Sequence, residues 1–194
     1  MTKGLSHYLR QAWKKPDAKT LQARMIKWRA SDAIERVEKP LRLDRARALG
    51  YKAKRGFIVL RVRVVRGGRK RTRMEVKGRK PKKQTNRKTL KMNYQWVAEI
   101  RAARKYPSLE VLNSYNIGKD GRHYFFEVIM VDTTKAEIKT DRTTKWITSN
   151  KNSKRAERGL TSAAKKSRGL VSNRGKTPKI KVRPSLRAHN RKGK

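Results

Sequence analysis

The stretch from Gly50 to Arg71 reads GYKAKRGFIVLRVRVVRGGRKR and places one apolar segment between two dense runs of positive charge. Residues 57–65 alternate, with one face apolar and Arg61 and Arg63 on the other. The apolar face consists of Ile58, Leu60, Val62 and Val64. A period of two with β-branched side chains predicts a β-strand that lies on a core. The cations beside this strand need an anionic partner, and we expect folded RNA.

Composition limits what the rest of the chain can do. The 194 residues include 56 Lys and Arg against 14 Asp and Glu, which gives a net charge of +42. Such a charge opposes compaction unless counter-ions or a polyanion neutralise it. Only 35% of the residues are hydrophobic, so we expect one modest core with much of the chain outside it. The absence of cysteine excludes disulfides and thiolate chemistry, and a cytosolic location is the simpler interpretation.

The cations are spread along the whole chain. A protein that binds a membrane surface would concentrate them on one amphipathic helix, and no apolar run is long enough to span a bilayer. The first residues also lack the continuous apolar segment of a signal peptide. Nucleic acid is therefore the expected partner, ahead of a membrane or an acidic protein.

Two short helices are predicted before the strand. The first has apolar residues at helical spacing from Leu5 to Trp13 and ends before Pro16. The second begins after Asp17, a suitable N-cap, and its stripe contains Trp28. We expect both tryptophans to pack against the core and not to stack on bases. A further helical turn over residues 44–49 closes at a glycine, Gly50.

The remaining core elements follow the strand. A helix is predicted from about Thr89 to Tyr106, with an apolar stripe of Met92, Trp96, Ile100 and Ala103. Residues 109–117 alternate as a strand, residues 118–121 form a tight turn, and residues 124–131 form an interior strand. The expected fold is α+β, with a small mixed sheet in the order strand, helix, strand, hairpin, strand, and with the N-terminal helices as cover.

Glu127 is the only acid in the predicted interior strand. We expect it to pair with Arg61 or Arg63, because a buried carboxylate needs a cation and hydrogen bonds. The two arginines could instead contact RNA, and the sequence does not decide between these roles.

Two basic extensions flank this core. Residues 66–91 form an internal loop with 13 Lys and Arg and one acid, and residues 145–194 form a C-terminal extension with 17 Lys and Arg and one acid. We therefore divide the chain into a globular core, residues 1–144, and a basic RNA-binding extension, residues 145–194. A short helix is predicted in GLTSAAKKSRG, capped by Thr161 or Ser162 and closed by Gly169. Because the apolar residues of the extension are scattered, we expect all of residues 145–194 to be disordered alone and to fold only on the partner. A solvated linker is the alternative for the internal loop.

The candidate RNA-binding residues lie in three groups. Any single lysine among them could be an ordinary solvated surface charge, so the prediction concerns the groups. Gly67 and Gly68 would allow close approach of the backbone to RNA, or simply form a turn. The candidates are Lys52, Lys54 and Arg55 before the strand; Arg66, Gly67, Gly68, Arg69, Lys70, Arg71, Arg73, Lys77, Arg79, Lys80, Lys82 and Lys83 after it; and Arg155, Arg158, Lys165, Lys166 and Arg168 in the extension.

Several motifs resemble one family. The run RARALGYKAKRGFIVLRVRVVRGGRKR, the segment from Val111 to Asp132, TKWIT at residues 144–148 and RGLTSAAKKSRGL at residues 158–170 stand in the order found in ribosomal protein fifteen of the archaeal and eukaryotic large subunit, the e-type. The resemblance covers nearly the whole chain, and the short, cysteine-free sequence is more similar to archaeal members.

The resemblance implies a structural constituent of the large ribosomal subunit, cytoplasmic, with long basic extensions in contact with large-subunit (23S/28S-type) rRNA and neighbouring ribosomal proteins. It implies no catalytic role, cofactor, bound metal or small-molecule substrate. The residues agree, since the three histidines have no metal-ligand spacing and no acid–base pair or nucleophile motif is evident. From composition alone, a chromatin-type architectural protein is the alternative.

Overall fold

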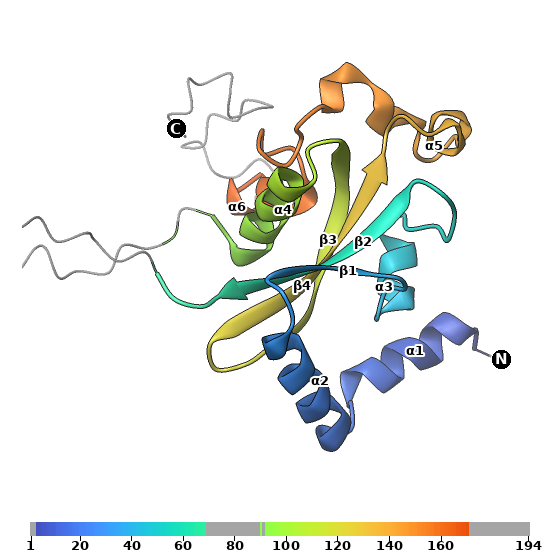
Figure 1. The fold of residues 1–194 in the computed structure, drawn as a ribbon. Helices are drawn as coiled ribbons and strands as arrows, with labels where there is room; N and C mark the ends of the chain where they lie inside the picture. Colours follow the sequence, from blue (N-terminus) through green and yellow to red (C-terminus); the bar gives the residue numbers. More distant parts are fainter. Residues whose placement is uncertain (1–2, 69–89, 91, 171–194) are drawn as a thin grey trace, which may run out of the picture.

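The computed structural model describes residues 3–68, 90 and 92–170. A four-stranded sheet with the order β1-β2-β4-β3 forms its centre (Figure 1). The strands are β1 (Ile34–Val37), β2 (Phe57–Val65), β3 (Leu109–Lys119) and β4 (His123–Asp132). The α+β class and the three predicted strands are confirmed, and β1 adds an edge strand that the sequence did not reveal.

The sheet is antiparallel in all three of its described ladders, and the mixed pairing that we predicted is absent from them. Strands β2 and β3 are joined through a helix, as predicted, but they are not neighbours because β4 lies between them. The second strand of the hairpin, β4, therefore pairs with β2, and the first strand, β3, lies at the edge of the sheet. Each neighbouring pair is antiparallel as a result.

The alternation predicted for β2 is confirmed. Leu60, Val62 and Val64 are buried on the face that packs against helix α4 (Tyr94–Lys105). Their neighbours Arg61 and Arg63 point to the opposite face. One strand thus supplies apolar contacts to one layer and cations to the other.

Strand β3 contains two irregularities that the sequence pattern concealed, and the first of them changes the face on which its side chains lie. Its register with β4 shifts between Val111 and Asn113, which leaves Leu112 as an extra residue. Val111 packs with the α4 layer, whereas Leu112 and Tyr115 pack in the opposite layer. The prediction of uninterrupted alternation from residue 109 to residue 117 is therefore wrong, because the bulge reverses the faces part-way along the strand.

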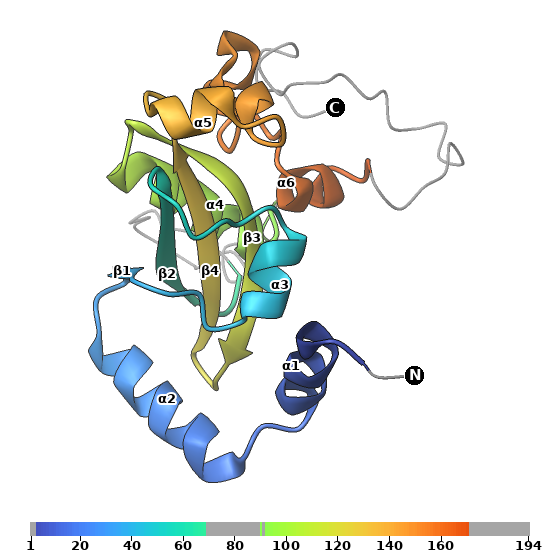
Figure 2. The same cartoon turned by 90° about the vertical axis from the view of Figure 1, so that its right-hand side faces the viewer.

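Helices cover both faces of the sheet (Figures 1 and 2). On one face, Ala98 and Ala102 of α4 are completely buried, and their small side chains let the helix lie close to the strands. On the other face, Met25 and Trp28 of α2 (Ala18–Ala30) belong to one apolar cluster with Ala46 of α3 (Leu43–Ala48) and with Phe125 of β4, whose ring contacts Trp28. Trp28 is thus a core residue, as predicted.

The first helix, α1 (Leu5–Lys14), forms where expected but buries none of its residues. Trp13 is partly buried beside the core, whereas Leu5 and Tyr8 are exposed. The expectation that both N-terminal helices cover the core therefore holds for α2 only.

Side-chain caps fix three helix starts. Asp17 accepts a hydrogen bond from Thr20 N at 2.9 Å, which confirms the predicted N-cap of α2. Asn93 accepts from Trp96 N at 2.7 Å, so α4 begins at Tyr94, later than the predicted start near residue 89. Thr161 caps α6 (Ser162–Ser167), and Gly169 closes this helix with a φ of +76°, as predicted.

Residues 145–170 pack against the central sheet and α4. They follow α5 (Ala136–Thr140) and contain two short 3₁₀ helices, η2 (Lys145–Thr148) and η3 (Asn150–Asn152), before α6. Ile147 and Ala156 are buried in the two main cores, and Trp96 of α4 packs on Ala163 and Ala164 of α6. The division of the chain after residue 144 stays a prediction. The expectation that the extension folds only on its partner is wrong for residues 145–170, because their buried side chains share the core. Residues 171–194 lie outside the described residues.

Candidate nucleic-acid interface

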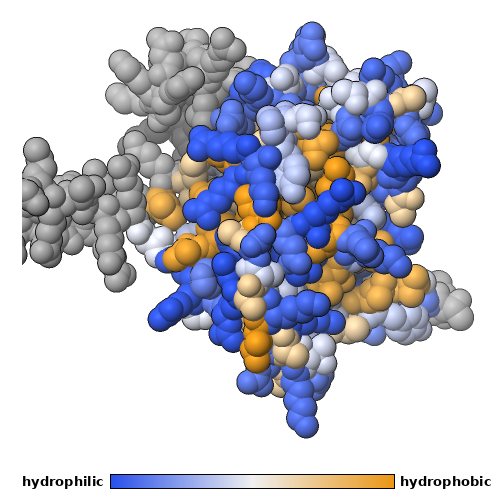
Figure 3. All heavy atoms as spheres, viewed as in Figure 1, coloured by the Kyte–Doolittle hydropathy of each residue, from blue (hydrophilic) through white to orange (hydrophobic). Residues whose placement is uncertain are grey.

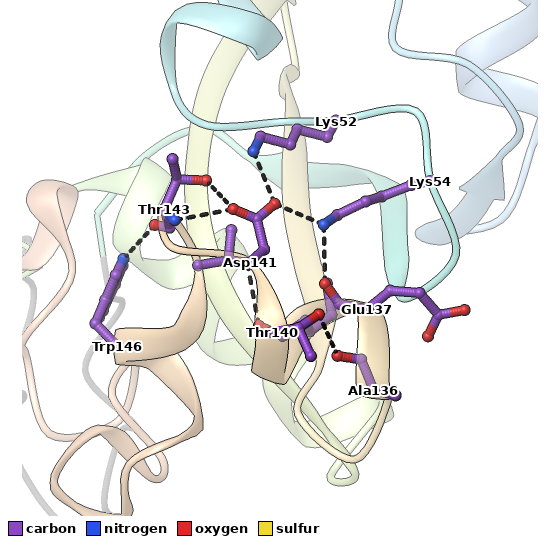
Figure 4. A network of polar contacts seen from close by, with 10 residues as sticks. Lys52, Lys54, Ala136, Glu137, Thr140, Asp141, Thr143 and Trp146 are labelled. Atoms are coloured by element: carbon purple, nitrogen blue, oxygen red, sulfur yellow. Dashed lines mark hydrogen bonds and ion pairs between the residues drawn. The ribbon is translucent and has the colours of Figure 1, made fainter.

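The first group of candidate cations lies in the loop before β2. Lys52 Nζ and Lys54 Nζ lie 2.7 and 2.5 Å from Asp141 Oδ2, and Lys54 also donates to the carbonyl of Glu137 at 2.8 Å (Figure 4). The hydrogen bond from Lys52, and to a smaller extent the one from Lys54, hold the pKa of Asp141 well below its usual range. The two lysines therefore fasten the loop to the segment after β4, while Arg55 is exposed.

The second group begins where β2 ends. Arg66 donates to the carbonyl of Asp120 at 2.7 Å and lies over the ring of Tyr124, 5.2 Å from its centroid. Gly67 has a φ of +112°, which favours glycine. Its N–H donates to Tyr94 Oη at 2.9 Å, and that hydroxyl donates to the Gly67 carbonyl at 3.0 Å. The chain therefore leaves the sheet in a fixed direction, with Gly68 exposed.

The other candidates of this loop lie outside the described residues. They are Arg69, Lys70, Arg71, Arg73, Lys77, Arg79, Lys80, Lys82 and Lys83. The structure does show how the start of this loop is held to the core, by the two hydrogen bonds between the hydroxyl of Tyr94 and the backbone of Gly67.

The third group is divided between the interior and the surface. Arg155 is only 8% exposed and donates to the carbonyls of Val111 and Leu112 at 2.5 and 2.6 Å. Burial lowers the pKa of its guanidinium. The side chain therefore satisfies backbone acceptors beside the β3 bulge and faces away from solvent.

The remaining members of this group lie nearer the surface. Arg158 donates to the carbonyls of Lys151 and Ser153 at 2.8 and 3.1 Å. Arg168 donates to the carbonyl of Gly159 at 2.8 Å. The side chains of two candidates are exposed on α6, namely Lys165 and Lys166.

Arg61 and Arg63 serve the fold. Arg61 pairs with Glu35 of β1 at 3.1 Å and lies over the indole of Trp28, 5.2 Å from the ring centroid. Arg63 donates to the carbonyl of Arg29. Both side chains thus join the sheet to the α2 layer and the edge strand.

Glu127 is completely buried, as expected, but its partners differ from the prediction. Its carboxylate accepts hydrogen bonds from the hydroxyl of Tyr115 and from Leu41 N, the latter at 3.2 Å. Arg61 stands opposite Glu127 in the register, yet it also stands opposite Glu35 and forms its ion pair there. The predicted direct pairing of Glu127 with an arginine is therefore wrong. Burial raises the pKa of Glu127.

A second buried acid, Glu99, ties α4 to the C-terminal segment. Its carboxylate accepts hydrogen bonds from Ser114 of β3 and from Thr161, the N-cap of α6. Burial raises its pKa, opposed by these two bonds and by the nearby charge of Arg155. The exposed cations of α6 are therefore presented from a helix whose start is anchored in the interior.

Sequence reasoning missed Asp141 and Tyr94, which fix the loops that carry the first two groups. An isolated acid in a segment rich in cations was a usable signal for Asp141. Tyr94 offered none, because its partner is a backbone group 27 residues away in the sequence.

The surface of the domain mixes polar and apolar side chains. Figure 3 shows hydrophilic side chains over much of the face in view, with apolar areas between them. Among the described residues, no cluster of three or more His, Asp or Glu side chains could hold a metal ion. In the same part of the chain, no helix has the length and apolar character needed to cross a bilayer.

A protein of this class, a small α+β domain that presents cations from anchored loops and helix ends, is typical of ribonucleoprotein components. The family model described as Ribosomal L15 matches residues 4–189, and the chain therefore belongs to the Ribosomal L15e family. It is 49% identical over 199 aligned positions to "Large ribosomal subunit protein eL15" of Methanospirillum hungatei JF-1, and the alignment covers all of both chains. The family resemblance inferred from the motifs is confirmed, and with it the prediction of a non-enzymatic ribosomal protein.

Proposed function

We propose that this protein is a structural constituent of the large ribosomal subunit in the cytoplasm, where it binds and stabilises folded large-subunit rRNA. The observation that carries this proposal is the 49% identity to a large-subunit protein over the entire length of both chains. Neighbouring large-subunit proteins are its other expected partners.

Charge neutralisation is the proposed mechanism. After the 14 acids of the chain have balanced 14 of its 56 lysines and arginines, a net charge of +42 remains to be neutralised by a partner. Each contact of a lysine or arginine with a phosphate releases condensed counter-ions, and the logarithm of the binding constant falls by about 0.7–0.9 per contact for each log unit of salt. Arginine adds planar, two-pronged contacts to phosphate oxygens.

The structure supports different roles for different candidates. Arg55, Lys165 and Lys166 are exposed and suited to phosphate contact. Arg155 is committed to the interior, and Lys52 and Lys54 are shared with Asp141. Residues 66–91 and 145–194 remain the proposed RNA-binding extensions, and the described contacts at Gly67 and Thr161 would set the directions in which they leave the core.

Sedimentation distinguishes this proposal from a chromatin-type role. Tagged protein expressed in an archaeal host should be recovered with large ribosomal subunits and should remain there after a high-salt wash. Recovery with DNA instead of subunits, or release from the subunits at moderate salt, would contradict the proposal.

A charge series tests the mechanism. Replacing both Lys165 and Lys166 with alanine should reduce the slope of log K against log salt by about 1.4–1.8, because two phosphate contacts are lost. An unchanged slope would show that α6 does not face RNA.

A further inference from the structure

Trp146 differs from the other tryptophans of the chain. It is 44% exposed, whereas Trp28 and Trp96 are each 3% exposed and Trp13 is partly buried beside the core. Single exposed apolar residues are common on protein surfaces, so exposure alone assigns no role. The surroundings of this indole do.

The backbone and ring of Trp146 are held in place. Its neighbours Thr144 and Ile147 are 2% and 1% exposed, so both sides of the η2 turn are fixed in the core. The indole Nε1 donates to the carbonyl of Thr143 at 3.0 Å (Figure 4), and Asn152 donates to the carbonyl of Trp146. Little conformational freedom is left for the ring to lose when it binds a partner.

One side of the ring is already covered. The guanidinium of Arg155 lies 4.8 Å from the ring centroid and is itself fixed by the carbonyls of Val111 and Leu112. Arg155 is buried, so the exposure of Trp146 comes from the rest of the indole. The result is a rigid aromatic surface with a cation behind it.

The sequence around Trp146 is rich in exposed cations. Arg142, Lys145 and Lys151 are exposed within five residues of Trp146 in the sequence. Asp141, the nearest acid in the sequence, is neutralised by its two lysine partners. A ligand of Trp146 must therefore be flat, able to stack, and tolerant of surrounding cations, which describes a nucleobase attached to its phosphates.

We propose that Trp146 is a stacking site for an unpaired nucleobase of RNA. This inference rests on the proposed function, because it takes RNA as the partner. Aromatic side chains combined with a cationic surface bind single-stranded nucleic acid by stacking on successive bases. Bases in a regular duplex are stacked on each other and unavailable, so the site selects loops, bulges and ends.

The test uses the full-length protein with two probes, a single-stranded oligoadenylate and an RNA duplex of equal length. Replacing Trp146 with alanine should weaken binding to the oligoadenylate about 5- to 150-fold and leave binding to the duplex unchanged. The salt dependence should be unaltered, because no charge is removed.

Three further variants complete the comparison. Trp146→Phe should retain most of the affinity, whereas Trp146→Leu should lose as much as alanine, since it keeps the apolar volume without an aromatic face. Tyr8→Ala is the matched control, because Tyr8 is an aromatic residue that is 57% exposed on α1. It should bind both probes like the wild type.

The same experiment distinguishes failure of the stacking site from failure of the proposed function. If the wild type binds RNA and Trp146→Ala binds oligoadenylate equally well, the stacking site is refuted and the proposed function stands. Equal losses on both probes, or an equal loss in the phenylalanine variant, would also refute stacking. If the wild type binds neither probe, the proposed function itself is wrong.

Discussion

Arg155 allows the sharpest test of how the structure uses its cations. Replacing it with alanine is expected to lower the free energy of unfolding by about 3–5 kcal/mol. The side chain donates to two buried carbonyls, those of Val111 and Leu112, and a hydrogen bond from a charged donor contributes about 1.5–3 kcal/mol. Losing two such bonds would lower the free energy of unfolding by about 3–6 kcal/mol. The variant no longer buries a guanidinium, and the cost that it avoids makes the net loss smaller than this sum.

The measurement is urea unfolding of the full-length protein at constant salt, followed by circular dichroism. Arg55→Ala is the matched control, because Arg55 is exposed in the loop before β2. Its replacement should change the free energy of unfolding by no more than about 0.5 kcal/mol.

The same variant separates the two roles that Arg155 could play. If it faces the interior, Arg155→Ala leaves the salt dependence of RNA binding unchanged under conditions where the variant is folded. If it contacted phosphate, as the sequence suggested, the slope would fall by about 0.7–0.9. A loss of stability below about 1 kcal/mol together with such a fall in slope would refute the buried assignment.

Three further predictions concern the core. Gly56→Ala should destabilise the fold by about 1–3 kcal/mol in the same urea assay, because its φ is +89° and an added Cβ would come within 2.7 Å of Cγ1 of buried Ile138, whereas Gly121→Ala, with nothing within 4 Å, should not. Glu127 has a raised pKa in the folded protein, so the folded state binds more protons than the unfolded state at pH values above the ordinary glutamate value of 4.5, and stability falls as the pH rises through this window. Glu127→Gln should flatten that fall in urea titrations carried upward from about pH 4.5, and an unchanged pH profile would contradict the assignment. Ending the chain after residue 144 should lower the melting temperature measured by circular dichroism, because buried Ile147 and Ala156 are lost, whereas ending it after residue 170 should retain the helices and strands described above.

Local signals in the sequence were sufficient for much of the fold. The alternation of β2, the cap of α2 at Asp17 and the capped helix after Thr161 depend on residues within a few positions of one another. The turn at residues 118–121 likewise defined the hairpin of β3 and β4. Each of these features is encoded by spacing and side-chain chemistry that can be followed along the chain.

Features that depend on distant residues were missed. The edge strand β1 has only four residues and is a strand because β2 offers it a partner. The bulge in β3 reverses the faces at Leu112, and only the pairing with β4 reveals it. The candidate site shows the same limit, since the interior role of Arg155 follows from carbonyls more than 40 residues away in the sequence.

The contact between Tyr94 and Gly67 has a consequence for the evolution of the family. One hydroxyl joins Gly67, two residues after the end of β2, to the first residue of α4, so the two ends of the intervening stretch are held together independently of its length. Insertions and deletions between them should leave the register of the strands unaltered, because closing a longer loop costs little additional entropy. The alignment with the Methanospirillum protein spans 199 positions for the 194 residues of this chain, so it contains insertions relative to this chain. A basic arm attached in this way can lengthen or shorten with its partner while the domain that holds it stays the same.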